Sequence, residues 1–550
     1  MTPPMQSLSL PLSKLPQTTK LFATFLDHFA KVNHYYAHPP TLAGVRESAA
    51  QVKIDPATRE NVVEILRAQN ARFDPSGALD PATAKNLDRL ASGAVAIVTG
   101  QQVGLFGGPS YSVYKALSAL RWADALSSEG IEAVPVFWLA TEDHDLAEVN
   151  HVFWNSRSGL RRLELASQPA DAGHRVGEIP LGEPVRDLVA QALDALEGGE
   201  FEWVAGILRE SYTPSATYGS AFGNLMARIL AGRGIIFLDP LDAGLHRLAA
   251  PVYLRAIEDS AAIRDALIAR SKELEHGGFH AQVKVAREST LLFATVEGRR
   301  QPLRSRNGNF IAGEQSFSRE ALLAEITRAP ENFTPNVLLR PIVQDTLLPT
   351  AAYIGGPAEI AYMAQTRIVY DKILGRMPAM LPRAGFTLVE PPIARLMKKY
   401  GLDAQELILD RRRLRSRMEL AVLPRGLSRR FEKDEKSLRR ILASYTASFS
   451  RLDKTLLGAR DTSERKMLHQ FLKLKSRAAR AEAFRSGVVD AHERLILDAL
   501  APNRSLQERS LCFLPFLAAN GPQVLDTLAR LSCPCDSGPA ASPVHHVVFL

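Results

Sequence analysis

Four ionisable residues stand in a row after an apolar run at residues 134–139. They are Glu142, Asp143, His144 and Asp145. Carboxylates in this position could hold the ammonium group of a substrate. His144 could remove a proton, since the charge of a histidine changes near neutral pH. The pattern therefore predicts a site for a substrate that carries an amine.

Two other interpretations of this segment stay open. Asp143, His144 and the nearby His151 could hold a metal ion, although their spacing matches no familiar ligand set. The acidic residues could instead cap the N-terminus of a helix that faces solvent. We expect no resident metal, and we add Asn150 and His151 to the residues that could contact the substrate.

A glycine-rich segment follows a second apolar run, at residues 94–98. Its glycines allow a tight turn and a close approach to a ligand; they are Gly100, Gly104, Gly107 and Gly108. The N-terminus of the helix that follows would favour phosphate or carboxylate, because its N–H groups are free. Lys115, about two turns into that helix, could reach back to the same group. Three further side chains are expected near the substrate: Gln101, Gln102 and Tyr111. A tight turn without a ligand is the alternative.

The glycine pattern recurs later in the chain. Residues 107–114 and 355–362 share Gly-Gly-Pro, then four residues, then Tyr, and each segment follows an apolar run. Two such turns side by side would form a double anion-binding mouth that includes Gly355 and Gly356. Glu359, which follows the second turn, is expected to contact the substrate. Coincidence is the alternative, because this turn chemistry is common. Asp239 ends another apolar run and is either a substrate-binding residue or a helix cap.

Arginine and amide side chains in the last third of the chain suit a nucleotide. Arg383 follows a proline, and Asn503 and Arg504 lie in a short polar loop. Arginine binds phosphate and carboxylate groups through paired hydrogen bonds. We assign these three residues, together with the glycines of both turns, to cofactor binding.

These residues need a scaffold that brings them together. Apolar runs at residues 94–98, 134–139, 234–239 and 353–354 predict buried strands, and the runs between them predict helices. Alternating strands and helices predict an α/β fold with a parallel sheet. Ligands bind at the carboxyl ends of such strands, where the polar segments above lie.

The domain organisation follows from the same alternation. Residues 1–92 are expected to be helical and to pack on the core. The Rossmann-like core spans residues 93–390, with insertions at about 160–215 and 270–335. Residues 391–500 form a helical arm, and residues 501–550 return to the core.

The arm has the pattern of a coiled coil. Apolar residues from Phe431 to Leu456 recur at a spacing of seven and then at alternating spacings of four and three, and Gly458 interrupts them. We expect two helices, at about 427–457 and 462–497, folded back on each other as an antiparallel hairpin. Such an arm is typical of a dimerisation device, so we expect a homodimer.

Charge is unevenly distributed along the chain. Residues 391–490 carry 25 basic and 12 acidic residues, a net charge of +13, whereas the whole chain carries +8. A basic segment could meet nucleic acid. No aromatic residues are interleaved with the basic runs to stack on bases, so we expect no nucleic-acid partner.

Composition excludes several classes of protein. With 46% hydrophobic and 23% charged residues, the 550-residue chain is not disordered. Its three cysteines, Cys512, Cys533 and Cys535, exclude a disulfide scaffold and fit a reducing compartment. Cys533 and Cys535 could bind a metal or act in redox chemistry, or be incidental thiols. No apolar run approaches the ~20 residues of a membrane span, and no signal peptide is recognisable, so we expect a cytoplasmic protein without a membrane partner.

Five segments together resemble a known family. They are TGQQVGLFGGPSYSVYKALSAL, PVFWLATEDHDLAEVNH, YIGGPAEIAY, LPRAGFTLVE and PNRSLQER. In this order, from about residue 97 to 515, they resemble the bacillithiol biosynthesis cysteine-adding enzymes, the BshC family. The resemblance implies a Rossmann-like core with connecting-peptide insertions, similar to class I aminoacyl-tRNA synthetases, and a coiled-coil arm that pairs two subunits.

The resemblance also implies a reaction. It joins the carboxyl group of cysteine to the amine of glucosaminyl malate. An amide made from a carboxylate needs activation, so we expect ATP with Mg²⁺, or bound ADP. On this basis Glu142, Asp143 and Asp145 would hold the cysteine ammonium. Lys115 and the glycines would bind phosphate or carboxylate, and His144 would deprotonate the attacking amine.

One departure from the synthetases limits the comparison. Those enzymes carry a His-x-Gly-His signature after the first strand and a Lys-rich loop later. Here no histidine lies between Thr99 and Asp143, and there is no Lys-Met-Ser-Lys-Ser run. An acyl-phosphate route that releases ADP and a separate nucleotide pocket both stay open. Two other functions also stay open: a ligase for another amino acid or acceptor, and a non-catalytic coiled-coil dimer that binds a nucleotide or RNA.

Overall fold

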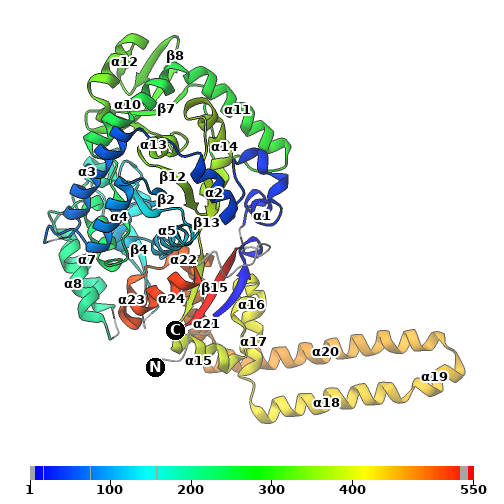
Figure 1. Cartoon of the computed structure of the whole chain (residues 1–550). Helices are drawn as coiled ribbons and strands as arrows, with labels where there is room; N and C mark the ends of the chain where they lie inside the picture. The colour runs from blue at the N-terminus through cyan, green and yellow to red at the C-terminus, as the bar shows by residue number, and fades with distance from the viewer. Residues whose placement is uncertain (1–6, 17, 75, 157–158, 197–198, 533–542) are drawn as a thin grey trace. The chain divides into compact units, whose positions relative to one another are not determined.

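The computed structural model describes residues 7–16, 18–74, 76–156, 159–196, 199–532 and 543–550 (Figure 1). The chain divides into two compact units. The first comprises the described residues up to Thr387 together with those from Gln507 to Val548, and the second comprises Leu388–Leu506 with the last two residues. Cys533 and Cys535, for which a metal or redox role was one interpretation, lie outside the described residues.

A five-stranded parallel sheet lies at the centre of the first unit, which confirms the predicted α/β class. Its strand order is β13-β12-β2-β3-β6. The strands are β2 (Val95–Gln101), β3 (Ala133–Leu139), β6 (Ile236–Leu238), β12 (Thr350–Gly355) and β13 (Ala379–Pro382). The chain runs from β2 to one side and later returns to the other. The pair β2/β12 is therefore the topological switch point, where ligands bind in open sheets of this kind.

Four of these strands are predicted from the sequence, and β13 is missed. Ala379–Pro382 is only four residues long and is bounded by prolines, which argue against a strand in a sequence pattern. Its pairing with β12, rather than its own residues, holds it extended.

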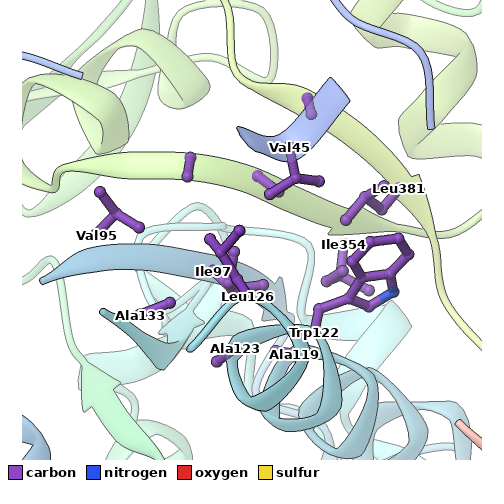
Figure 2. Packing of buried hydrophobic residues seen from close by; sticks show 13 residues of the cluster. Val45, Val95, Ile97, Ala119, Trp122, Ala123, Leu126, Ala133, Ile354 and Leu381 are labelled. Atoms are coloured by element: carbon purple, nitrogen blue, oxygen red, sulfur yellow. The ribbon is translucent and has the colours of Figure 1, made fainter. Parts of the chain in front are cut away.

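The core forms where helix α5 (Tyr111–Ser128) packs on the sheet. Strand β2 is apolar and buried from Val95 to Val98, because helices cover both faces of a parallel sheet. Figure 2 shows how Ile97, Ile354 and Trp122 meet in this cluster. Val45, from helix α2 (Leu42–Ala50), joins it. This packing fixes the positions at which β2 and β12 end.

The N-terminal part of the chain is helical up to β2. The helices are α1 (Lys20–Asp27), α2, α3 (Pro56–Arg72) and α4 (Pro81–Ala91). Asp55 and Asp80 start the last two by accepting hydrogen bonds from the main-chain N–H groups of Thr58 and Thr83. In each case a proline takes the first helical position, where no N–H is needed.

Two segments between the strands have structure of their own. The first contains the hairpin β4 (His151–Ser156) and β5 (Gly159–Glu164) and the helices α7 (Pro184–Asp194), α8 (Phe201–Ser211) and α9 (Tyr218–Ile229). The second follows α10 (Ala243–Glu258) and α11 (Ser260–His276) and is an antiparallel sheet of order β10-β9-β8-β7-β11. Its strands are β7 (Ser289–Val296), β8 (Arg299–Arg306), β9 (Asn309–Ala312), β10 (Gln315–Phe317) and β11 (Phe333–Pro335).

The remaining elements of the first unit lie before and after the second unit in the sequence. Helices α12 (Arg319–Arg328), α13 (Arg340–Leu347) and α14 (Pro357–Ile373) complete the part before the arm. A three-stranded sheet pairs β1 (Ser7–Pro11) with β15 (Val544–Phe549) and β15 with β14 (Gly385–Val389). Helices α22 (Gln507–Ser510), α23 (Leu514–Asn520) and α24 (Gln523–Leu531) follow the second unit in sequence.

The second unit is helical. Helices α15 (Pro391–Tyr400), α16 (Ala404–Leu409) and α17 (Leu414–Ala421) precede the arm, whose elements are α18 (Arg425–Ser444), α19 (Thr446–Leu452), α20 (Thr455–Ser486) and α21 (Val488–Leu500). Helices α18 and α20 run side by side with α19 at the turn (Figure 1). The rings of Phe431 and Phe471 lie 5.4 Å apart, and Arg439 pairs with Glu464 at 3.6 Å. The predicted antiparallel hairpin is therefore present.

The predicted boundaries within the arm are wrong. The break between the two long helices falls at Asp453, whose carboxylate accepts from the main-chain N–H of Thr455, and Gly458 lies inside α20. A helical glycine costs only about 1 kcal/mol, which packing along the hairpin offsets. The second break is at Gly487, whose φ of 64° is left-handed and ends α20 before residue 497.

No helix among the described residues is long and apolar enough to cross a membrane.

Candidate active site

A cavity of about 730 Å³ opens at the carboxyl ends of β2, β3 and β12. It lies at the switch point of the sheet, where the polar segments of the sequence converge. Another wall comes from the region of the antiparallel sheet: Gln282, Val283, Phe293, Arg300, Pro335, Asn336 and Val337. All of its lining residues belong to the first unit.

Eleven of the residues predicted for the site line this cavity. They are Gly100, Gln101, Gln102, Tyr111, Lys115, Glu142, Asp143, His144, Gly356, Glu359 and Arg383. Ten others do not: Gly104, Gly107, Gly108, Asp145, Asn150, His151, Asp239, Gly355, Asn503 and Arg504. The structure thus brings the ends of the two turns together with the acidic segment, and leaves out the middle of the glycine-rich loop.

The glycine-rich loop faces the protein interior. The N–H of Gly107 donates to the hydroxyl of Tyr212, and Phe106 packs edge-on against Tyr212 and Trp154. Gly107 and Gly108 have φ values of 87° and 65°, which glycine adopts without strain. These glycines shape the turn into α5, and their N–H groups are not presented to the cavity.

The other residues outside the cavity have local partners. Asp145 is exposed and stands at the N-cap position of the short helix α6 (Leu146–Val149), but its side chain makes no capping hydrogen bond. The amide oxygen of Asn150 accepts from Nδ1 of His151 at 3.2 Å. Asp239 accepts from the hydroxyl of Thr141 at 2.5 Å. Asn503 and Arg504 lie in the 3-10 turn η9 (Pro502–Arg504) of the second unit.

Lys115 and Glu359 form a buried ion pair that joins the two Gly-Gly-Pro turns. Lys115 Nζ lies 2.6 Å from Glu359 Oε2 and also donates to the carbonyl oxygen of Gly100 and to Gln101 Oε1. An ammonium group has three protons, so each has an acceptor. Burial alone would raise the pKa of Glu359, but Lys115, Tyr353 and the N–H of Gly356 hold it below its usual value. Lys115 therefore organises the cavity wall and has no proton to spare for an anion.

The neighbouring carboxyl groups Glu142 and Asp143 are in opposite states. Burial raises the pKa of Glu142 to about 8. Burial would also raise the pKa of Asp143, but hydrogen bonds from Gln102 and from the main-chain N–H of His144, together with the charge of Arg300, hold it well below its usual range. Asp143 is thus ionised at neutral pH, whereas Glu142 mostly keeps its proton. Of the acidic residues expected to hold an ammonium group, Asp143 is suited to do so.

His144 is fixed by an arginine from the antiparallel sheet. Arg300 Nη1 lies 2.9 Å from His144 Nδ1, and its other nitrogens donate to the hydroxyl of Thr334 and the carbonyl oxygen of Pro335. A guanidinium group can only donate, so Nδ1 must accept. The proton of a neutral His144 then sits on Nε2, which can donate to a ligand but has no lone pair to accept a proton.

Three arginines give the cavity a basic wall. Arg340 stacks between the rings of Trp138 and Tyr353 at 5.8 and 5.5 Å, and Arg383 lies over Tyr111 while it pairs with Glu508 at 2.6 Å. Arg509, which is exposed, lines the same cavity. Arginines held in this way suit carboxylate and phosphate groups.

Sequence reasoning missed Arg300 and Arg340. Arg300 comes from β8 and Arg340 begins α13, and neither stands next to a strand of the parallel sheet in the sequence. No local pattern marks them, since only the folding of the second inserted segment brings them to the strand ends.

A metal site is not apparent in the part of the chain that the structure describes. No three His, Cys, Asp or Glu side chains gather there as metal ligands would. Asp143, His144 and His151, which were one interpretation of a ligand set, are not such a group.

Comparison with known proteins agrees with this architecture. Residues 5–384 match the model of the N-terminal Rossmann-like domain of bacillithiol biosynthesis BshC, and residues 386–538 match that of its C-terminal coiled-coil domain. The chain belongs to the BshC family. A BshC relative from Koribacter versatilis, described as "Putative cysteine ligase BshC", is 39% identical over 98% of this chain and 99% of its own.

Two further BshC relatives carry the same description. The one from Solibacter usitatus is 37% identical, covering 94% of this chain and 95% of its own. The one from Salinibacter ruber is 32% identical, covering 92% and 93%. The similarity therefore extends over both BshC domains, and the predicted family, Rossmann-like fold and coiled coil are confirmed.

Removal of one partner of the buried ion pair should destabilise the protein strongly. Lys115→Met leaves the Glu359 carboxylate buried without its counter-charge, which costs about 3–5 kcal/mol of the free energy of unfolding. The double variant Lys115→Met/Glu359→Gln should recover part of that loss. Arg121→Ala on the same helix breaks a pair of half-buried Arg121 with exposed Asp124 and should cost about 1 kcal/mol or less. Urea unfolding measures all three, and equal losses for Lys115→Met and Arg121→Ala would contradict the account.

Glu142→Gln should stabilise the protein in a pH-dependent way. The native state keeps a proton on Glu142 up to about pH 8, whereas the unfolded chain loses it near pH 4.5. The wild-type free energy of unfolding therefore falls between these pH values, and glutamine removes that fall. The free energy of unfolding of the variant should exceed that of the wild type only slightly at pH 4.5, and by roughly 3–5 kcal/mol at pH 8. Urea unfolding at several pH values tests this, and a constant difference would contradict it.

Proposed function

We propose that this protein is a ligase that joins the carboxyl group of cysteine to the amine of glucosaminyl malate, with ATP as the source of energy. One observation carries the proposal. An ionised carboxylate and a set of arginines face one cavity at the switch point of a chain whose BshC relatives are described as cysteine ligases. Cysteine offers an ammonium and a carboxylate, and glucosaminyl malate adds further carboxylates.

Different side chains of the cavity bind different groups of the substrates. Asp143 holds the ammonium group of cysteine. Gln102 donates a hydrogen bond to Asp143 at 2.8 Å and so keeps the Asp143 carboxylate in place. Arg340 and Arg383 bind carboxylate or phosphate groups. His144 donates a hydrogen bond from Nε2 to a substrate oxygen. Binding both substrates in one cavity lowers the barrier through proximity.

The basic wall also fits the phosphates of a nucleotide. A triphosphate supplies the activation that an amide bond from a free carboxylate requires. Mg²⁺ usually arrives with the phosphates and needs only one or two protein carboxylates. Asn503 and Arg504, in the second unit, belong to no site in this proposal. The reaction is assigned to the cytoplasm, in keeping with the small number of cysteines.

Asp143→Asn should impair the reaction selectively. Loss of the charge removes the partner of the cysteine ammonium, so KM for cysteine should rise about tenfold or more. Asp145→Asn is the same change two residues away, outside the cavity, and should behave like the wild type. Mass spectrometry of purified protein with cysteine, glucosaminyl malate, ATP and Mg²⁺ gives the rates. No product from the wild type would refute the function, and equal effects of the two variants would refute the role of Asp143.

We also propose that the arm pairs two copies of the chain. Helix α18 buries none of its residues, and Ile441 and Leu474 are 57% and 56% exposed on the hairpin. A second copy would cover such apolar surface.

Sedimentation should give twice the mass of the chain for the wild type and for the control Lys473→Asp. Ile441→Asp/Leu474→Asp should give a monomer with unchanged helix content, and a monomeric wild type would contradict the proposal.

A further inference from the structure

Glu142 lines the cavity, but the proposed binding of substrates assigns it no role. Its side chain is only 7% exposed, yet it faces the same space as Asp143. Glu142 Oε1 lies 3.4 Å from His246 Nε2, and His246 Nδ1 lies 3.3 Å from the hydroxyl of Tyr253. His246 and Tyr253, both on α10, are buried, and Nε2 has no hydrogen-bond partner of good geometry in the described structure. A chain of three polar groups thus runs from the interior to the cavity wall.

This chain has a defined protonation pattern. Burial lowers the pKa of His246 to about 4 and raises that of Tyr253 well above 10, so both are neutral near pH 7. When Tyr253 donates to Nδ1, the proton of the imidazole sits on Nε2, which lies 3.4 Å from Glu142 Oε1. That N–H can stabilise an ionised Glu142 and fix the direction of its carboxylate.

Several charged groups face Glu142 from the surrounding elements. The positive charges of Arg300, Arg175 and Arg340 favour its ionised form, and Asp239 opposes it. Burial outweighs them, so the pKa of Glu142 is close to that of a free amine rather than to that of a surface carboxylate. Transfer of a proton between two groups of similar pKa is efficient near neutral pH.

The other candidate proton acceptors of the cavity are poorly suited. His144 accepts from Arg300 at Nδ1, so its free nitrogen carries a proton. Asp143 already accepts from the side chain of Gln102 and the N–H of His144, and its low pKa makes it a weak base. Lys115 has all three protons engaged.

We propose that Glu142 is the residue that takes the proton from the acceptor amine, and that His246 and Tyr253 position it. This role rests on the proposed ligase function. The amine of the acceptor arrives as an ammonium ion and gives one proton to the Glu142 carboxylate. The neutral amine then attacks the activated cysteine carbonyl carbon. The C–N bond forms, the bond from carbon to the phosphoryl oxygen breaks, and the second proton leaves with the phosphate-containing group.

The test compares two nucleophiles. Hydroxylamine is a weak base and is already uncharged at neutral pH, so its attack on activated cysteine needs no proton acceptor. Glu142→Gln should lower the rate with glucosaminyl malate by about 10²–10⁴-fold. The rate of hydroxamate formation should stay within about threefold of the wild type. His144→Ala should show no such selectivity between the two nucleophiles.

The outcomes separate this inference from the function. If the wild type forms neither amide nor hydroxamate, the ligase function itself fails. If the wild type forms amide and Glu142→Gln keeps its rate, or loses both reactions equally, Glu142 is not the proton acceptor. Misfolding is not expected to mimic the result, because Glu142→Gln preserves shape and removes a buried ionisable group.

The pH profile of kcat tests whether His246 positions Glu142. His246→Leu removes the N–H that faces the carboxylate, so the rise of kcat with pH should move to higher pH. His246→Asn keeps a donor and should restore part of the wild-type profile. An unchanged pH profile in His246→Leu, with kcat uniformly lower, would mean that His246 is only structural.

Discussion

The buried pair of Lys115 and Glu359 is the interaction on which the site depends. Two opposite charges are removed from water at the point where β2 and β12 end, a cost that only complete pairing can offset. Each proton of Lys115 has an acceptor, and Glu359 also accepts from Tyr353 and from the N–H of Gly356. The two halves of the sheet are thereby tied together across the switch point. The repeated Gly-Gly-Pro turns supply one partner each.

This arrangement sets the electrostatics of the cavity. Because the ion pair is internally neutral, the charge offered to a ligand comes from Asp143 on one side and from the arginines on another. Glu142 lies beside Asp143 in the sequence but is buried against His246. Adjacent carboxyl groups are thus pushed toward opposite protonation states, one suited to hold a cation and the other to exchange a proton near neutral pH.

The sequence predicts the parts of the site that lie next to strands. Lys115, Glu359 and the acidic segment follow β2, β12 and β3, and the carboxyl ends of parallel strands necessarily meet. The roles of individual residues are harder to predict from the sequence. Lys115 resembles a phosphate ligand in the sequence, and only its distance to Glu359 shows that it is already paired.

Residues brought in from far along the chain are not predictable from local pattern. Arg300 and His246 lie on β8 and α10, and their neighbours in the sequence give no hint of a cavity. The middle of the glycine-rich loop shows the opposite error. Gly107 and Gly108 suggest a ligand, yet they are required by the turn that buries Phe106.

The proposed binding of cysteine at Asp143 is tested most directly by one structure. The protein would be crystallised with cysteine and an ATP analogue that cannot transfer its phosphoryl group. The predicted result is the cysteine ammonium within hydrogen-bonding distance of Asp143, with its carboxylate in the same cavity toward the arginines. Cysteine bound outside this cavity, or in it with the ammonium away from Asp143, would contradict the account.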